Sequence, residues 1–159
     1  MPQELTHTNS TKALAWAAAA LFAVSWFLPV LEDVPGWMAF RYALAPLIPF
    51  GDRDGSSIGW EDSIPQLMSA LTNVVFIILF ALWVLRQSPR AALFVRIALA
   101  CFLLNLYWFV SAWRDHALAD LLPGYYVWVA AFALLLAVAG LIAFSNRRTS
   151  KTPTAGTPS

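Results

Sequence analysis

Charged side chains are scarce in this sequence. Only 12% of its 159 residues are Asp, Glu, Lys or Arg, whereas a soluble domain has about 25%. Hydrophobic residues make up 60%, compared with about 45–50% in a soluble domain. The formal net charge is +1, so the strongly basic character of a nucleic-acid-binding protein is missing and we expect no nucleic-acid partner. In a short chain this composition excludes an ordinary soluble domain and predicts apolar surface that faces lipid.

Reactive side chains are also few. Cys101 is the only cysteine, which excludes a disulfide framework and a Cys-x-x-Cys thiol redox centre. His7 and His116 belong to no metal-binding or hydrolase motif, so we expect no metal and no cofactor. No Asp or Glu lies within the long apolar runs, which argues against a proton pump or an ion-coupled transporter. These absences favour a protein that is not an enzyme, without excluding one.

The sequence does have four long apolar runs. Each is close to the twenty or so residues that a helix needs to cross a hydrocarbon core of about 30 Å. Helices are expected because backbone groups in lipid must be satisfied within the segment. We therefore predict an all-α integral membrane protein, an antiparallel bundle of four transmembrane helices. The expected parts are a cytoplasmic N-tail (1–12), a membrane domain (13–145) with spans at 13–31, 66–85, 91–113 and 125–145 and an outer loop at 32–65, and a disordered cytoplasmic C-tail (146–159).

The lysines and arginines predict the orientation. They are more numerous at one set of span ends, which holds Lys12, Arg86, Arg90, Arg147, Arg148 and Lys151, than at the other, which holds Arg41, Arg53 and Arg114. The positive-inside rule places the richer set in the cytoplasm. We therefore expect a multi-pass protein of the plasma membrane, the bacterial inner membrane, with both termini cytoplasmic.

The N-terminus allows a second interpretation. A basic residue, an apolar run and the small residues Ala18, Ala19 and Ala20 resemble a cleaved signal peptide. The apolar run continues through Leu28, which favours an uncleaved first span. Cleavage would leave three spans and an outer N-terminus.

The outer loop suggests the first hypothesis for function. Prolines break its acidic start, and the apolar stretch from Trp37 to Ile48 is too short to span, so we predict a short interfacial helix. The aromatic and acidic side chains of this loop that we expect to bind a partner are Trp37, Phe40, Trp60, Glu61 and Asp62. The protein would then be a non-catalytic accessory subunit, an immunity-type protein or a sensor. Its expected partners are the lipid bilayer, a membrane or extracytoplasmic protein, or a second copy of the chain.

Polar residues inside the spans suggest the alternative. Ser69 and Asn73 share a face of the second span, and Asn105 is expected at a similar depth in the third, so a hydrogen bond between the asparagines, direct or through a neighbour, is predicted. Arg96 falls on the opposite face from Asn105, where it either snorkels to lipid phosphates or has a buried role. A packing clamp and a ligand pocket both fit this pattern. The pocket would belong to a membrane-embedded carrier or enzyme of a small lipidic substrate.

Small residues recur on the fourth span. They follow helical spacing and would let another helix approach closely, so we predict that the span packs through Ala130, Ala133, Ala137 and Gly140.

Two short runs carry a resemblance. Ser-Trp-Phe-Leu-Pro-Val at 25–30, followed by Gly-Trp-Met-Ala-Phe at 36–40, resembles uncharacterised small four-span inner-membrane proteins of bacteria. The resemblance covers the first two spans and their loop and implies no catalytic residue. The large first outer loop is similar in plan to that of claudin-type proteins, but the cysteine pair of their outer loop is absent here, so their function is not implied.

Overall fold

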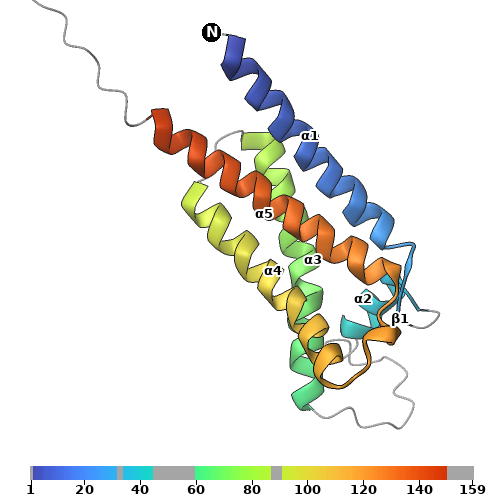
Figure 1. The fold of residues 1–159 in the computed structure, drawn as a ribbon. Helices are drawn as coiled ribbons and strands as arrows, with labels where there is room; N and C mark the ends of the chain where they lie inside the picture. Colours follow the sequence, from blue (N-terminus) through green and yellow to red (C-terminus); the bar gives the residue numbers. More distant parts are fainter. Residues whose placement is uncertain (1, 32–33, 45–59, 87–90, 150–159) are drawn as a thin grey trace, which may run out of the picture.

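The chain is mostly helical. The computed structural model describes residues 2–31, 34–44, 60–86 and 91–149, and the side chains within 9–30, 34–44, 64–85 and 91–145. Three helices of this part are long and apolar enough to cross a membrane, over Ile64–Leu85, Ala91–Arg114 and Pro123–Ser145. The expectation of membrane-length helices is therefore confirmed for the second, third and fourth predicted spans. The first span differs from the prediction (Figure 1).

The first helix, α1, covers Pro2–Ser25 and ends six residues before the predicted boundary at residue 31. A proline disfavours helical backbone at the residue before it, so Pro29 keeps Leu28 out of the helix. The last turn closes with a bond from the Phe27 amide to the Val24 carbonyl, at 3.0 Å. The apolar helical part of α1, from residue 13 to 25, is therefore only about 20 Å long at 1.5 Å per residue.

The remaining apolar residues form a hairpin instead of more helix. Strand β1 (Pro29–Leu31) pairs antiparallel with β2 (Val34–Pro35), and α2 (Gly36–Leu44) follows directly. This α2 is the short helix that was predicted in the outer loop. The Gly36 amide donates to the Leu28 carbonyl at 3.0 Å. A Cβ on Gly36 would collide with the Ser25 carbonyl oxygen, so only glycine permits this close approach.

The three later helices match the predicted spans more closely. Helix α3 covers Trp60–Arg86 and begins six residues before the expected start, with Pro65 inside its first turns. Helix α4 covers Ala91–Arg114, within one residue of the prediction. A 3₁₀ turn, η2 (Leu118–Asp120), leads to α5 (Pro123–Thr149). Pro123 takes the first helical position, where its missing N–H is no loss.

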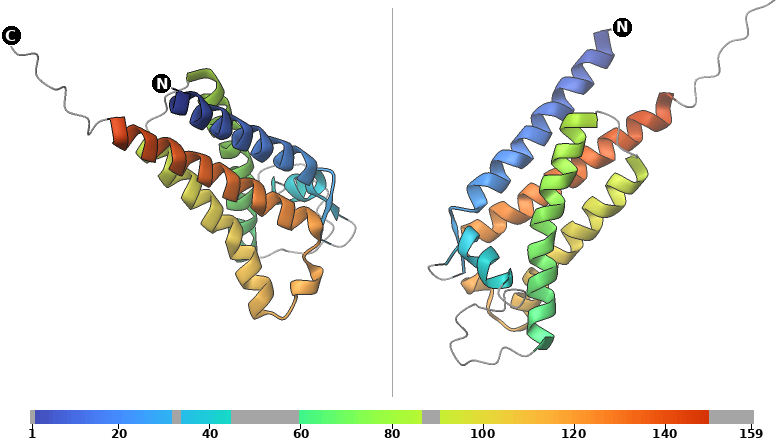
Figure 2. Two further views of the ribbon diagram at one scale, coloured as in Figure 1. Left: turned by 45° about the horizontal axis from the view of Figure 1, so that its top comes forward. Right: turned by 180° about the vertical axis from the view of Figure 1, so that it is seen from behind.

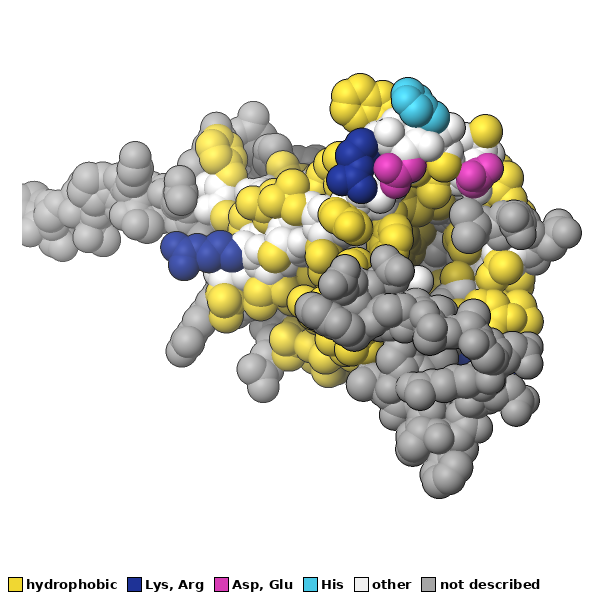
Figure 3. Space-filling view, turned by 90° about the horizontal axis from the view of Figure 1, so that it is seen from below, with side chains coloured by type: hydrophobic (Ala, Val, Ile, Leu, Met, Phe, Trp, Pro, Cys, Tyr) yellow, Lys and Arg dark blue, Asp and Glu magenta, His cyan; other side chains and the backbone are white. Residues whose placement is uncertain are grey.

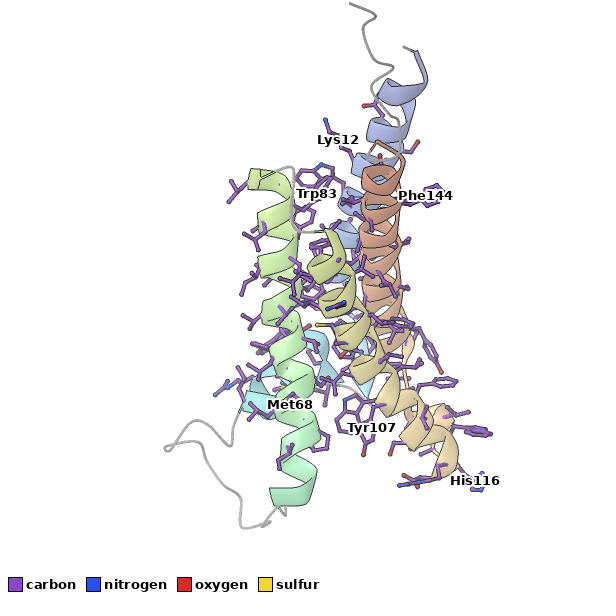
Figure 4. The ribbon with its side chains drawn as sticks, turned by 90° about the vertical axis from the view of Figure 1, so that its left-hand side faces the viewer. Lys12, Met68, Trp83, Tyr107, His116 and Phe144 are labelled. Carbon is purple, nitrogen blue, oxygen red and sulfur yellow. The ribbon has the colours of Figure 1, made fainter. Side chains whose placement is uncertain are left out.

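Helix α5 is central to the packing, with α1 along one side and α4 along the other. Helix α3 packs against α4, and α2 lies against α3 (Figure 2). The start of α1, the end of α3, the start of α4 and the end of α5 lie at one end of the molecule, which is called here the terminal end. Lys12 and Trp83 lie toward the terminal end, and His116 lies at the other, which is called here the hairpin end (Figure 4).

Aromatic rings hold α1, α3 and α5 together. Phe22 stacks on Phe76 with ring centroids 4.2 Å apart, and Phe132 meets Phe76 edge-on at 5.1 Å. All three rings are buried, Phe132 completely. Edge-on and stacked pairs of this kind add about 0.5–1.5 kcal/mol to the burial of the rings.

The small-residue stripe of α5 does not form this packing face. Ala130, Ala133, Ala137 and Gly140 are all exposed, and nothing lies within 4 Å of a Cβ built on Gly140. The buried face of α5 is the neighbouring one, with Ala131, Phe132, Leu135, Val138 and Ala139. Packing within the chain thus uses a face that combines small residues with Phe132 and Leu135, because those larger side chains bury more apolar area. The prediction that α5 packs within the chain through the small stripe is wrong.

Candidate functional site

The hairpin end is joined by backbone contacts between segments far apart in sequence. The Leu122 amide, just before α5, donates to the Val30 carbonyl of β1 at 3.2 Å. A Cβ on Gly124 would lie 2.5 Å from the Pro29 carbonyl oxygen and 2.8 Å from that of Leu28. The start of α5 therefore lies directly against the hairpin, at a distance that only glycine allows.

A cavity of about 360 Å³ lies beside these contacts. Its lining comes from the end of α1, the hairpin, α2, the first half of α3, the end of α4 and the start of α5. Among the described residues, six aromatic side chains contribute to its walls: Trp26, Phe40, Tyr42, Trp108, Tyr125 and Trp128. The remaining described lining residues are Ser25, Val30, Val34, Gly36, Ala39, Ala43, Gln66, Ser69, Ala70, Asn73 and Leu121. None of the described lining residues is Asp, Glu, Lys, Arg or His, so the walls are aromatic, aliphatic or neutral polar.

The polar side of the cavity lies on α3. Ser69 and Asn73 stand one turn apart, and each is only 8% exposed. The indole Nε1 of Trp128 donates to the Asn73 Oδ1 at 2.7 Å, which fixes the amide and ties α3 to α5. Among the residues that the structure describes, neither Ser69 Oγ nor Asn73 Nδ2 has a hydrogen-bond partner. The cavity therefore offers two neighbouring polar groups on an otherwise apolar wall.

Asn105 forms a separate network next to the cavity. Its side chain is completely buried, and its Oδ1 lies 3.0 Å from the Thr72 hydroxyl. The Tyr125 hydroxyl donates to the Asn105 backbone carbonyl at 2.9 Å. Within the described part of the chain, Asn73 and Asn105 form no hydrogen bond with each other. Asn73 bonds to Trp128, whereas Asn105 bonds to the residue that precedes Asn73.

The Thr72 hydroxyl has one proton and two possible acceptors. The Ser69 carbonyl lies at 2.6 Å and the Asn105 Oδ1 at 3.0 Å, so the shorter bond takes the proton. Asn105 Nδ2 is buried and has no partner among the described residues. Turning the amide by 180° would let Nδ2 donate to Thr72 Oγ1, and O and N of an amide are assigned from such networks. In either orientation one side-chain polar atom of Asn105 has no hydrogen-bond partner among the described residues. The contact is therefore less stabilising than a packing clamp with all its hydrogen bonds made.

The predicted partner-binding residues are divided by the structure. Phe40 lines the cavity, and Trp37 is 45% exposed and outside it. The side chains of Trp60, Glu61 and Asp62 lie outside the described residues. Of the predicted intramembrane residues, Ser69 and Asn73 line the cavity and Asn105 does not. Arg96 is exposed on α4, away from the cavity.

Three residues of the site, Trp128, Tyr125 and Thr72, were not predicted from the sequence. The first two are aromatic residues near the outer end of a predicted span, where rings are expected for interfacial anchoring alone. Thr72 precedes Asn73 in the sequence, and the polar side chain of Asn73 was the only feature that pointed to this position. Their roles follow from the packing of α5 against α3 and α4, which no local pattern encodes.

Some of the described charged side chains lie together at the hairpin end. Figure 3 shows basic, acidic and histidine side chains near one edge of the face seen from below, a further basic side chain at the left, and many hydrophobic side chains between them. Arg114 and Asp115 form an ion pair of 3.3 Å, with side chains 77% and 55% exposed. Such exposed pairs contribute little to stability. Within the described residues, no group of three or more His, Cys, Asp and Glu side chains is placed to hold a metal ion.

Comparison with known proteins identifies a distant relative. The chain is 28% identical over 102 residues to the uncharacterized protein YxaJ of Bacillus subtilis (strain 168), which covers 64% of this chain and 62% of that protein. The matched region thus spans less than two thirds of the relative. No family model and no solved structure matches the chain. The relative is consistent with the expected resemblance to an uncharacterised protein, and its name carries no activity.

Proposed function

We propose that this chain is a multi-pass membrane protein that acts by binding a small ligand in the cavity at its hairpin end. The observation that carries the proposal is the cavity itself. Its volume of about 360 Å³ falls in the range of roughly 300–1,000 Å³ found for small-molecule sites. Its mostly apolar walls with a few polar groups are also typical of such sites.

The cavity joins the two hypotheses that the sequence suggested. Phe40 comes from the outer segment, whereas Ser69 and Asn73 come from a predicted span, and all three line the same space. A receptor or sensing role follows if binding alone is the function. A carrier or enzyme of a small lipidic substrate is the alternative that uses the same residues.

Native mass spectrometry of the protein purified from its own membrane in mild detergent tests the proposal. We expect a small-molecule adduct at one per chain. Ala43→Leu, which places a larger side chain in the cavity, should remove the adduct. Ala100→Leu is the matched control, because Ala100 is exposed on α4 and does not line the cavity. A wild-type protein without an adduct, or an adduct retained equally by both variants, would contradict the proposal.

The proposed topology has four spans with both termini in the cytoplasm of a bacterial cell. Two observations support it. The apolar part of α1 is continued by an apolar hairpin, and the start of α1 and the end of α5 both lie at the terminal end. In a Cys101→Ala background, single cysteines at Ser10 and Ser159 should both resist a membrane-impermeant maleimide in intact cells. Labelling of Ser10→Cys alone would mean three spans with an outer N-terminus, and loss of residue 10 from the intact mass would mean that the first segment is cleaved.

A protein partner at the hairpin end is the second candidate function. It is favoured by the exposure of Trp37 and Tyr42 on α2, at 45% and 55%. Aromatic side chains exposed on one short helix are typical anchors of protein interfaces. Trp37→Ala should release a stoichiometric partner found in the native mass spectrum. Trp113→Ala is the matched control, since Trp113 is 65% exposed on α4.

A further inference from the structure

The lining of the cavity limits the charge of its ligand. An ionised group buried there would meet no opposite charge from any described lining residue. Burying an unpaired charge costs far more free energy than one or two neutral hydrogen bonds return. The ligand should therefore be uncharged.

Ser69 and Asn73 on α3, called here the polar pair, also limit the chemistry of the ligand. The Ser69 hydroxyl can donate one hydrogen bond, and the Asn73 amide is held by Trp128 so that Nδ2, a donor, remains. Both side chains are more than nine-tenths buried and both line the cavity. Residues four apart on a helix have Cβ atoms about 5–6 Å apart, so one oxygen atom can approach both donors. The natural complement is a hydrogen-bond acceptor.

The depth of the polar pair along the span is consistent with an amphiphilic ligand from the bilayer. Ser69 and Asn73 are five and nine residues into the span that begins at Ile64, which is about 8–14 Å along the helix at 1.5 Å per residue. The aromatic walls formed by Trp26, Phe40 and Trp108 complete an apolar space around the pair. We propose that the cavity binds an uncharged amphiphile from the bilayer, with a hydroxyl or carbonyl oxygen on Ser69 and Asn73 and its apolar part against the aromatic walls. This inference rests on the proposed binding function and specifies its ligand class.

Brominated probes can test the ligand class, because bromine quenches the fluorescence of nearby tryptophans such as those of the cavity wall. The protein is reconstituted in phosphatidylcholine nanodiscs and titrated with 11-bromo-1-undecanol. The matched probes are 1-bromoundecane, which lacks the oxygen, and 11-bromoundecanoate, which is charged. We expect saturable quenching by the alcohol at concentrations at which the other two give only the linear quenching of partitioning into lipid.

Two variants connect the result to the residues. Ser69→Ala should weaken the apparent affinity for the alcohol about three- to tenfold, the loss of one neutral hydrogen bond. Ser111→Ala, on α4 and outside the cavity, should leave it unchanged. Ala43→Leu should abolish saturation, and the Ser69 variant decides the matter if Ala43→Leu fails to fold.

The outcomes separate this inference from the proposed function. Saturable quenching by the hydrocarbon or the carboxylate, abolished by Ala43→Leu, would overturn the ligand class and leave the cavity as a binding site. An affinity for the alcohol that Ser69→Ala does not change would also overturn the inference, because the polar pair would then take no part. If no probe gives saturable quenching and the purified protein carries no adduct, both proposals fail.

Discussion

Gly124→Ala should disturb the hairpin end by adding a single methyl group. The new Cβ would lie 2.5 Å from the Pro29 carbonyl oxygen and 2.8 Å from that of Leu28. Real Cβ atoms essentially never come closer than 3.0 Å, so at least one carbonyl must move by the 0.5 Å difference. Both neighbours are backbone atoms, and no flexible side chain can absorb the shift. The hairpin must move away from the start of α5.

The expected loss of stability in Gly124→Ala follows from two opposing effects. Overpacking costs about 1–3 kcal/mol, and the change from glycine to alanine in a helix returns up to about 1 kcal/mol, so a net loss of about 1–2 kcal/mol is expected. The shift also stretches the 3.2 Å bond from the Leu122 amide to the Val30 carbonyl. Because Val30 lines the cavity, ligand binding should weaken together with stability. Thermal unfolding in detergent and the fluorescence titration measure the two effects.

Gly140→Ala is the control within the same helix. Nothing lies within 4 Å of its built Cβ, and the position is exposed in the interior of α5. The added methyl group meets no clash, so this variant should be as stable as the wild type or more stable, by up to about 1 kcal/mol. The reasoning is refuted if Gly124→Ala matches Gly140→Ala in thermal stability and binds the probe normally.

Three further changes test the polar network and the core. Thr72→Val should cost about 0.6–2 kcal/mol in thermal unfolding, because Asn105 loses its side-chain partner, and Thr72→Ser should restore most of it. Trp128→Phe keeps a ring but removes the donor to Asn73, so it should lose a similar amount and raise hydrogen exchange in α3; unchanged exchange would argue against the bond. Phe132→Ala empties a fully buried ring site and should cost about 3–5 kcal/mol in the same assay, whereas a loss below about 1 kcal/mol would mean that the ring is not in the core.

The sequence predicted the long helices because a span leaves a strong signal of length and composition. The end of α4 was predicted within one residue, since Arg114 and Asp115 mark the boundary with water. The end of α1 was missed by six residues, because apolar content continues past Ser25 while Pro29 stops the helix. Apolar composition indicates the environment of a segment, whereas a proline restricts its backbone conformation. The two signals therefore give different boundaries at the end of α1.

The site was predicted in part for a similar reason. Polar residues inside a span are rare enough to attract notice, so Ser69, Asn73 and Asn105 were identified individually. Their partners were not, because a hydrogen bond from Trp128 to Asn73 joins positions 55 residues apart and depends on how two helices rotate about their axes. The small stripe of α5 shows the same limit: helical spacing defined the stripe, but only packing decides which of two adjacent faces is buried.

The early end of α1 also explains why a cavity exists at the hairpin end. Beyond Ser25 the chain no longer fills space as a helix, whereas α3 and α4 continue past this level and α5 begins beside the hairpin. The hairpin and α2 occupy part of the missing volume, held there by close backbone contacts at Gly36 and Gly124. The two strands are thinner than a helix, and α2, with nine residues, is shorter than a full span, so space remains between them and α3. The Trp-Phe-Leu-Pro run that ends the first helix is therefore the local cause of the cavity, and the polar residues of α3 give that space its chemistry.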